Sequence, residues 1–291
     1  MNFSLAAGLF NLMARLPLAV LHRLGAVLGW LTYNLSGQYA VRLRENLMQA
    51  YKDHPRDEVR KILNANIAET GKGIMELAWI WQRPVAEVLS RVSNCYGMEH
   101  LEAARARGCG VILLTPHMGC FEIVGLYVAQ QVALTCMYRP SKLSWLDEIM
   151  LRGRQHGKMH LARTDIGGVR TLLKALKRGE VIGLLPDQVP GKGEGEWTEF
   201  FGRPAYTMTL VGRLQEATGA SILLAYNERL PNGAGYVIHI MPLQAIADIS
   251  LPTQINAALE QIIRTSPAQY LWSYNRYKIP ARVNSAGSRE R

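Results

Sequence analysis

The chain has 291 residues, of which 48% are hydrophobic and 19% are charged, enough for one large α/β domain or two small ones. Lysine and arginine outnumber aspartate and glutamate by 33 to 23, and this formal charge of +10 favours an anionic partner such as nucleic acid, an anionic membrane or an acidic carrier protein. Aromatic residues make up only 8%, which disfavours an aromatic platform for nucleic acid. The four cysteines have no CxxC or zinc-ligand spacing, which indicates reduced thiols without disulfides.

Residues 1–35 are strongly apolar and are interrupted by Arg15, His22 and Arg23. No uninterrupted apolar run reaches the roughly 20 residues of a simple spanning helix, and no signal-peptide cleavage site follows. We therefore expect an N-terminal membrane-associating helix over residues 1–35. It either lies in the membrane interface or crosses the bilayer at a tilt with Arg15 paired or snorkelling. The alternative is a helix that is buried in a soluble protein.

Residues 39–95 are predicted to be helical, with Gly71 and Gly73 breaking or bending one helix. From about residue 96, apolar runs of strand length alternate with amphipathic segments. Strands are expected at 110–115, 132–138, 158–162, 181–185, 221–226 and 236–240, and helices at 98–107, 120–131, 143–155, 167–178, 207–218 and 253–264. Residues 190–206 are expected to form a long Gly-rich loop, and Asn232-Gly233 a hairpin turn. This order predicts an α/β domain over residues 36–291, with a mixed, mainly parallel central sheet and helices on both faces.

One candidate site follows the all-apolar strand Val111–Leu114. His117 lies just beyond this strand, and Glu122 lies in the first turn of the next helix. In open α/β sheets, ligand-binding and catalytic residues lie mostly at the carboxyl ends of the strands. The same His-x4-acid spacing recurs at His160 and Asp165, but that pair lies in a polar stretch where Asp165 fits a helix cap. The strand-end context therefore favours His117 over His160, although a surface histidine is the alternative.

The loop before the helix allows the imidazole of His117 to fold back onto the carboxylate of Glu122. Such a carboxylate fixes the tautomer and favours the imidazolium, as a general base requires. Cys120 lies between the two residues and is a candidate nucleophile, although a cysteine there is more often simply packed. Arg139 and Asp187 also follow predicted strands, and Asp187 is expected to organise the arginines. A basic rim is expected from Arg152, Arg154, Lys158 and Arg163.

Several motifs occur together in a specific order over nearly the whole chain. They are the apolar N-terminus, His117…Glu122, Tyr138-Arg139-Pro140, Arg152-Gly153-Arg154, Leu172–Val181, Pro186-Asp187, Phe200–Ala205 and Gln269-Tyr270-Leu271-Trp272. With them the chain resembles the lipid A biosynthesis lauroyl/myristoyl acyltransferases of the Gram-negative inner membrane, which are related to glycerolipid acyltransferases. It departs from the better-known members at Gln188-Val189-Pro190, where they carry His-Asp-Tyr, and at Tyr274-Asn275-Arg276, where they carry His-Arg-Arg.

The resemblance implies a glycerolipid-acyltransferase-like fold and an O-acyltransferase at the cytoplasmic face of the inner membrane. Its donor is an acyl thioester on acyl carrier protein, and its acceptor is a hydroxyl of a lipid A precursor. His117 and Glu122 form the implied catalytic dyad, the His-x4-Glu motif, without a cofactor, metal or enzyme nucleophile. The implied substrate-binding residues are Arg139, Arg163, Asp187 and Gln188. Backbone N–H groups near 118–120 are the expected oxyanion donors.

These expectations name acyl carrier protein, a lipid acceptor and the anionic membrane as partners, and no nucleic acid. One alternative is an acyltransferase for another amphiphile, such as a lysophospholipid or an ornithine lipid. The others are a thiol hydrolase that uses Cys120 with His117, and a basic membrane-surface protein without catalytic activity.

Overall fold

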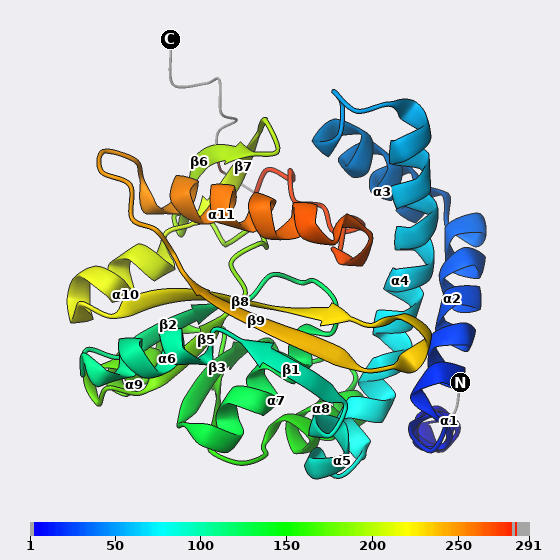
Figure 1. The fold of residues 1–291 in the computed structure, drawn as a ribbon, viewed down its shortest axis with the longest axis horizontal. Coiled ribbons are helices and arrows are strands. Elements are labelled where there is room, and N and C mark those ends of the chain that lie inside the picture. Colours follow the sequence, from blue (N-terminus) through cyan, green and yellow to red (C-terminus); the bar gives the residue numbers. More distant parts are fainter. Residues whose placement is uncertain (1–2, 281–282, 284–291) are drawn as a thin grey trace.

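Seven strands form one central sheet in the order β1-β9-β8-β2-β5-β3-β4 in the computed structural model, which describes residues 3–280 and 283 (Figure 1). Neighbouring strands run parallel except for the antiparallel pair β8 and β9. The predicted mixed, mainly parallel sheet is therefore confirmed. The strands are β1 (Val92–Tyr96), β2 (Val111–Leu114), β3 (Leu134–Tyr138), β4 (Met159–Arg163), β5 (Val181–Leu184), β8 (Ser221–Arg229) and β9 (Tyr236–Pro242).

Helices cover both faces of the sheet, and each face has its own apolar core. Strand β2 shows why its residues are all apolar: Ile112 and Leu114 enter one core, and Val111 and Leu113 enter the other. The first core is closed by α9 (Ile166–Lys177), α10 (Leu210–Thr218) and α11 (Leu251–Thr265). The second is closed by α5 (Val85–Leu89), α6 (Met98–Ala106), α7 (Phe121–Gln131) and α8 (Ser144–Arg154). Asp165 caps α9 by accepting a hydrogen bond from the Gly168 N–H at 2.8 Å, as predicted.

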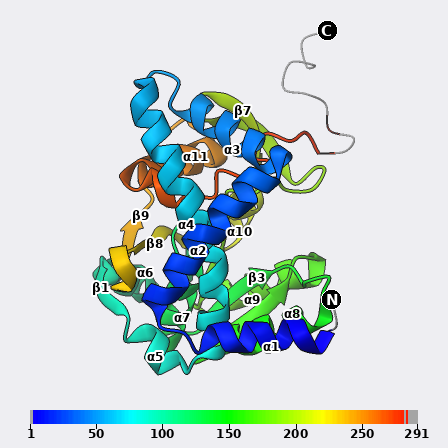
Figure 2. The ribbon, with the colours of Figure 1, turned by 90° about the vertical axis from the view of Figure 1, so that its right-hand side faces the viewer.

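The N-terminal residues form two helices instead of the single helix expected over residues 1–35. Helix α1 (Phe3–Ala14) ends just before Pro17, and α2 (Leu18–Leu35) begins after it. They are followed by α3 (Gly37–Ala50) and α4 (Arg56–Gln82). Figures 1 and 2 show these four helices gathered along one side of the sheet, with α2 crossing α4. Among the residues that the structure describes, no helix has both the length and the apolar character needed to cross a bilayer.

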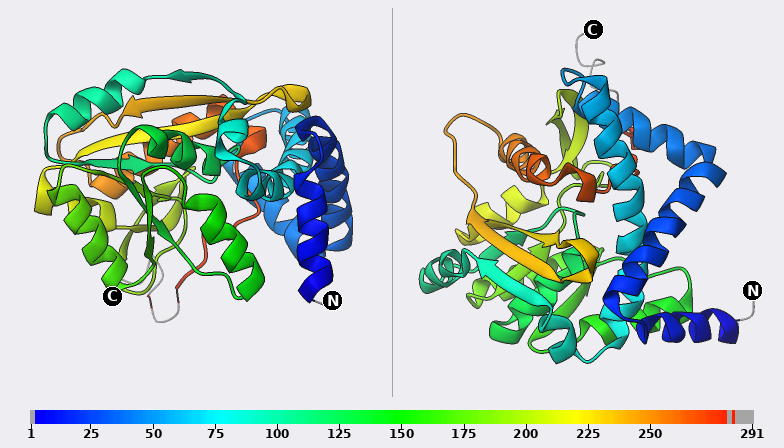
Figure 3. Two further views of the ribbon diagram at one scale, coloured as in Figure 1. Left: turned by 90° about the horizontal axis from the view of Figure 1, so that it is seen from below. Right: turned by 45° about the vertical axis from the view of Figure 1, so that its right-hand side comes forward.

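The sequence predicted a break or a bend at Gly71 and Gly73; helix α4 runs unbroken through both, so a break there is wrong. The glycine at 71 is needed for packing: a Cβ on it would lie 1.9 Å from the carbonyl oxygen of Gly25 on α2. Residues Gly25 and Gly29 allow the two backbones to approach closely at this crossing. Figure 3 shows from two further directions that this helical layer stands beside the sheet.

Two strand regions were predicted incorrectly. Strand β1 lies in a region expected to be helical; it is one of the two edge strands of the described sheet, pairs with β9 and has a mostly exposed sequence. Residues 190–206, expected to be a loop, contain β6 (Gly195–Phe200) and part of β7 (Arg203–Met208), which form a separate hairpin.

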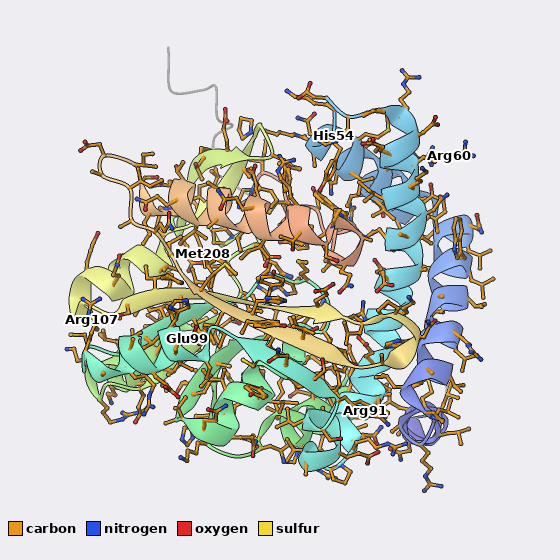
Figure 4. All side chains as sticks on the ribbon, in the orientation of Figure 1. His54, Arg60, Arg91, Glu99, Arg107 and Met208 are labelled. Carbon is orange, nitrogen blue, oxygen red and sulfur yellow. The ribbon has the colours of Figure 1, made fainter. Side chains whose placement is uncertain are left out.

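Side chains fill the space between sheet and helices, while charged groups such as Arg60 and Glu99 lie at the surface (Figure 4).

The structure also contains two short 3-10 helices: η1 (Pro231–Gly233), between β8 and β9, and η2 (Pro267–Gln269), after α11. After α11 the chain returns to the end of β2, where Tyr270 forms an isolated antiparallel bridge with Met118. We call residues 267–276 the C-terminal strap. It lies against the loop that carries His117 and is contacted by α4.

Candidate active site

His117 and Asp187 meet because β2 and β5 are parallel neighbours in matching register. Leu114 pairs with Leu184, and three further residues along each chain bring His117 beside Asp187 at the carboxyl edge of the sheet. The imidazole Nδ1–H donates to Oδ1 of Asp187 at 2.7 Å, and the backbone N–H of His117 donates to Oδ2 at 2.9 Å. The ring of Phe121 lies edge-on to the imidazole at 4.9 Å between centroids. The orientation of the imidazole is therefore set by Asp187 and Phe121.

The carboxylate of Asp187 is almost completely buried, with 2% of its surface exposed. Burial alone raises the pKa of Asp187, but the charge and hydrogen bonds of His117 outweigh it and hold the pKa below its usual value. The side-chain N–H of Gln188 donates to Nε2 of His117 at 3.1 Å. The imidazole therefore has its proton on Nδ1 and its lone pair on Nε2, the state that a general base needs.

The expected hydrogen bond between His117 and Glu122 is not formed in the described part of the chain. Both oxygens of Glu122 instead accept from Arg154: Nε donates at 2.9 Å, and Nη2 makes a second short bond. This pairing follows from packing, because Arg154 at the end of α8 lies against the first turn of α7, and its guanidinium also stacks on Trp81 at 5.7 Å. Burial lowers the pKa of Arg154, but Glu122 outweighs it and raises the pKa.

The expected oxyanion donors at 118–120 are occupied, which corrects that expectation. The N–H groups of Met118, Gly119 and Cys120 donate to the carbonyl oxygens of Pro116 and Gln269 and to Oδ1 of Asn227. In the described residues the next two N–H groups, those of Phe121 and Glu122, have no acceptor, as is usual for the first turn of a helix. The N–H groups that have no acceptor in the described structure are thus those of residues 121 and 122, directly after the expected positions 118–120.

Cys120 is poorly suited to act as a nucleophile. It is 4% exposed, and burial together with the nearby Glu76 raises the pKa of its thiol well above the usual value. No hydrogen bond joins it to His117 among the described residues. This environment favours a packed, protonated thiol.

The predicted substrate-binding arginines lie at the same edge of the sheet but apart from His117. Arg139 follows β3, which is separated from β2 by β5, and its exposed side chain has no hydrogen-bond or ion-pair partner within the described residues. Arg163 ends β4 at the outer side of the sheet, where it is the register partner of Tyr138 on β3. Asp187 contacts His117 and forms no ion pair with an arginine among the described residues, so its expected role of organising the arginines stays a prediction.

Two apolar cavities meet at Phe121 and Glu122, which line both. One has a volume of about 70 Å³ and lies among β2, β3, β5 and α7; its wall includes Arg154 and two glycines, Gly125 and Gly183. The other has a volume of about 220 Å³ and lies beneath α4; its wall includes His117 and residues 269–271 and 273 of the strap. The site thus combines a histidine oriented by a carboxylate with space for apolar groups.

Sequence reasoning missed two parts of this site. Arg154 was expected only in an outer basic rim, and its pairing with Glu122 required the position of α8. The strap was noted only as the motif Gln269–Trp272, which was the available signal. In the structure its backbone bonds directly to the loop: Gly119 N–H donates to Gln269, and Leu271 N–H donates to His117, both at 3.0 Å.

Residues 1–279 match the family model described as bacterial lipid A biosynthesis acyltransferase. The chain is 29% identical over 283 residues to the lipid A biosynthesis lauroyltransferase of Escherichia coli strain K12, covering 94% of this chain and 90% of that protein. It is 26% identical to the lipid A biosynthesis palmitoleoyltransferase of the same strain, with 93% and 89% covered. It is 28% identical to a lipid A biosynthesis acyltransferase of Haemophilus influenzae, with 95% and 90% covered. The chain belongs to the bacterial lipid A biosynthesis acyltransferase family.

Proposed function

We propose that this acyltransferase moves a fatty acyl chain from acyl carrier protein to a hydroxyl group of a lipid A precursor, with His117 as the general base. The observation that carries the proposal is the imidazole itself. Its Nδ1–H is held by the buried Asp187, its lone pair is on Nε2, and it lines an apolar cavity. Family membership supports the reaction class, and the names of the relatives support the acceptor.

In the proposed reaction, Nε2 of His117 takes the proton of the acceptor hydroxyl as that oxygen attacks the thioester carbonyl carbon. The carbonyl π electrons move to the oxygen and give a tetrahedral oxyanion. The N–H groups of Phe121 and Glu122 are suitable donors to it, because neither has an acceptor in the described structure. When the oxyanion collapses, the carbon–sulfur bond breaks, and the thiolate takes the proton from the imidazolium. Such a general base typically contributes about 10²–10⁴-fold in rate.

Glu122 is proposed to assist without touching the imidazole. Its carboxylate lies in the wall of the same cavity, where a nearby negative charge favours the imidazolium that forms during the reaction. Its bidentate pair with Arg154 also keeps the guanidinium in the wall of the smaller cavity. Asp187 takes the orienting role first expected of Glu122.

The two cavities suit two lipid-like substrates. We assign the acyl chain of the donor to the smaller cavity of about 70 Å³, because most of the residues that line it between β2, β3 and α7 are apolar, apart from the Glu122–Arg154 pair, Thr115 and Cys136. The cavity that contains His117 then receives the acceptor hydroxyl. The exposed Arg139 and Arg163, at the same sheet edge, fit phosphate groups or the acidic carrier.

We further propose that the protein lies on the cytoplasmic face of the inner membrane through its N-terminal helices. Large apolar side chains remain exposed on α1, α2 and α3, including Leu12 at 58%, Val27 at 58%, Leu31 at 52% and Met48 at 55%. Exposed apolar surface of this kind is typical of an interaction site. The exposed Arg15 and Arg23, together with the net charge of +10, favour anionic headgroups.

The test compares His117→Ala with His160→Ala, because the exposed His160 shares the His-x4-acid spacing and lies outside the site. Acyl transfer from acyl carrier protein to a lipid A precursor is measured by mass spectrometry. We expect His117→Ala to lose at least about 10²-fold in rate and His160→Ala to keep its rate. Full activity of His117→Ala would sink the general-base assignment.

The mass of lipid A from cells that lack the protein tests the acceptor. A loss of one acyl chain supports the proposal, and unchanged lipid A with another lipid altered supports an acyltransferase for a different amphiphile. Loss of activity in Cys120→Ala, but not in His117→Ala, would support a covalent mechanism through Cys120. The buried Cys120 makes that outcome the less expected one.

A further inference from the structure

Strand β8 continues past the end of β2 and lies beside the loop that joins β2 to α7. Its last pair with β2 is at Leu224, and the strand then runs on to Arg229, held in extended form by its antiparallel partner β9. Gly119 in the loop makes this approach possible, because a Cβ on it would lie only 2.1 Å from the carbonyl oxygen of Asn227. The loop is therefore packed directly against the last residues of β8.

Two side chains of β8 hold one peptide group of this loop, the group between Gly119 and Cys120. Oδ1 of Asn227 accepts from the Cys120 N–H at 2.9 Å, and Nη2 of Arg229 donates to the Gly119 carbonyl oxygen at 3.1 Å. Residues two apart on a strand point to the same face, so both side chains reach the loop together. We call Asn227 and Arg229 the β8 clamp. The peptide group cannot rotate without breaking both of these hydrogen bonds.

The guanidinium of Arg229 is itself held by helix α4. Its Nε and Nη2 donate to the two carboxylate oxygens of Glu76 at 2.8 and 2.6 Å, and its Nη1 donates to Glu69 at 2.6 Å. Arg229 and Glu76 are 4% and 0% exposed, so water does not compete for these charged hydrogen bonds. Asn227 is also fully buried, and its Nδ2 has no hydrogen-bond partner among the described residues. The side chain of Asn227 therefore acts on the loop through its oxygen.

The clamped peptide group comes directly before the two N–H groups that have no acceptor in the described structure. Cys120 is the N-cap of α7, and Phe121 and Glu122 are the first two residues of that helix. Each peptide group is planar and rigid, so the orientation of one group restricts the direction of the N–H groups that follow it. A change at the clamped group would therefore turn the N–H groups of Phe121 and Glu122 away from their present directions.

We propose that the β8 clamp positions the oxyanion donors of the acyl transfer, by aiming the N–H groups of Phe121 and Glu122 at the thioester carbonyl oxygen. This inference rests on the proposed function. Asn227 and Arg229 act through the backbone of the loop and are positioning residues. Negative charge develops on the carbonyl oxygen only as the acceptor oxygen attacks, so well-aimed donors stabilise the transition state more than the bound substrate. Loss of the clamp should therefore lower kcat more than it changes KM.

The experiment measures kcat and KM of acyl transfer from acyl carrier protein to a lipid A precursor for Asn227→Leu and Asn227→Asp in the full-length protein. Leucine removes the hydrogen-bond acceptor at similar volume, whereas aspartate keeps an oxygen for the Cys120 N–H. We expect Asn227→Leu to lose about ten- to a hundredfold in kcat with little change in KM, less than the 10²–10³-fold typical for complete removal of one oxyanion donor. We expect Asn227→Asp to keep kcat within about threefold of the wild type, because the acceptor is retained.

Asn256→Leu is the matched control for general destabilisation. Asn256 on α11 is 1% exposed and donates to the Glu199 carbonyl oxygen at 2.8 Å and to Oγ1 of Thr207 at 3.1 Å. It is thus as buried as Asn227 but contacts the β6–β7 hairpin instead of the loop after β2. We expect Asn256→Leu to lower Tm and to keep the wild-type kcat at a temperature where it is folded.

The comparison between the two Asn227 variants decides the matter. A wild-type kcat in folded Asn227→Leu overturns the proposal, and so does an equal loss in Asn227→Leu and Asn227→Asp. If Asn227→Leu does not fold, Arg229→Lys is the second test, because lysine keeps the charge beside Glu76 but lacks the fork that also reaches Gly119. A fall in kcat without a change in KM is expected there, and a wild-type kcat overturns the proposal.

Failure of the proposed function would be seen separately. A wild-type protein that transfers no acyl group to a lipid A precursor refutes the proposed function itself. An active wild type together with a fully active Asn227→Leu refutes only the role of the β8 clamp.

Discussion

Replacing Asp187 with asparagine isolates the orienting role of its carboxylate. The two oxygens have separate tasks, because Oδ2 accepts from the His117 backbone N–H at 2.9 Å and Oδ1 accepts from the ring at 2.7 Å. An asparagine has only one oxygen, which the backbone N–H takes. Its NH₂ group then faces Nδ1, and the ring must accept a hydrogen bond there. The imidazole proton is thereby moved to Nε2, which removes the lone pair that the acceptor hydroxyl needs.

The size of the effect follows from the two losses. Recovering the productive tautomer leaves a buried donor facing another donor, which costs about 1–3 kcal/mol. The imidazolium formed in the transition state also loses its buried counter-charge, since Asp187 is 2% exposed. A total of about 3–5 kcal/mol corresponds to a drop in kcat of about 10²–10⁴-fold.

The assay is the initial rate of acyl transfer from acyl carrier protein to a lipid A precursor, with kcat and KM separated. We expect kcat to fall while KM changes little, because the substitution does not reshape either cavity. A thermal melt checks that Asp187→Asn is folded. If the folded variant keeps kcat within about threefold, which is less than 1 kcal/mol of barrier, the orienting role of Asp187 is refuted.

Three further predictions concern the acyl cavity, the buried ion pairs and the membrane surface. In Gly125→Ala the new Cβ lies 3.2 Å from the flexible end of Met159, so the helix α7 gains up to about 1 kcal/mol in stability while the acyl cavity narrows. With mixed acyl donors, the masses of the products should shift to shorter acyl chains. Unchanged masses would refute the assignment of this cavity to the acyl chain. Burial raises the pKa of Glu76, but the interactions with Arg229 and His22 outweigh burial and lower this pKa to about 2. The ionised Glu76 carboxylate therefore stabilises the folded protein above about pH 4.5, and this stabilisation is lost as the pH falls toward 2. Glu76→Gln should destabilise by about 3–5 kcal/mol, or about 5–8 °C in Tm for 291 residues, and should remove this part of the acid dependence; an unchanged melt contradicts this. Leu31→Glu should weaken sedimentation with anionic vesicles by about ten- to a hundredfold, whereas Ile246→Glu, also exposed but on the loop before α11, should not; equal binding of both argues against the N-terminal surface.

The sequence by itself was sufficient to place the candidate residues His117 and Asp187 at strand ends. The apolar run Val111–Leu114 predicted a buried strand, and the residue types after it placed His117 at a strand end. Asp187 was placed at another strand end by the same reasoning. Such features are local, because burial on both faces is written into consecutive residues of one strand. The parallel sheet and most helices after residue 96 were predictable for the same reason.

Only the tertiary structure decided which of these residues touch. Register between β2 and β5 joins His117 to Asp187, and the packing of α8 on α7 joins Glu122 to Arg154. The same holds for Gly71, whose sequence suggested a helix break but whose role is the close crossing with α2. Chain spacing reports only neighbours a few residues apart, whereas these partners are separated by 32 to 70 positions. The candidate histidine could therefore be placed from one strand end, and its hydrogen-bond partners were set by the arrangement of strands and helices around it.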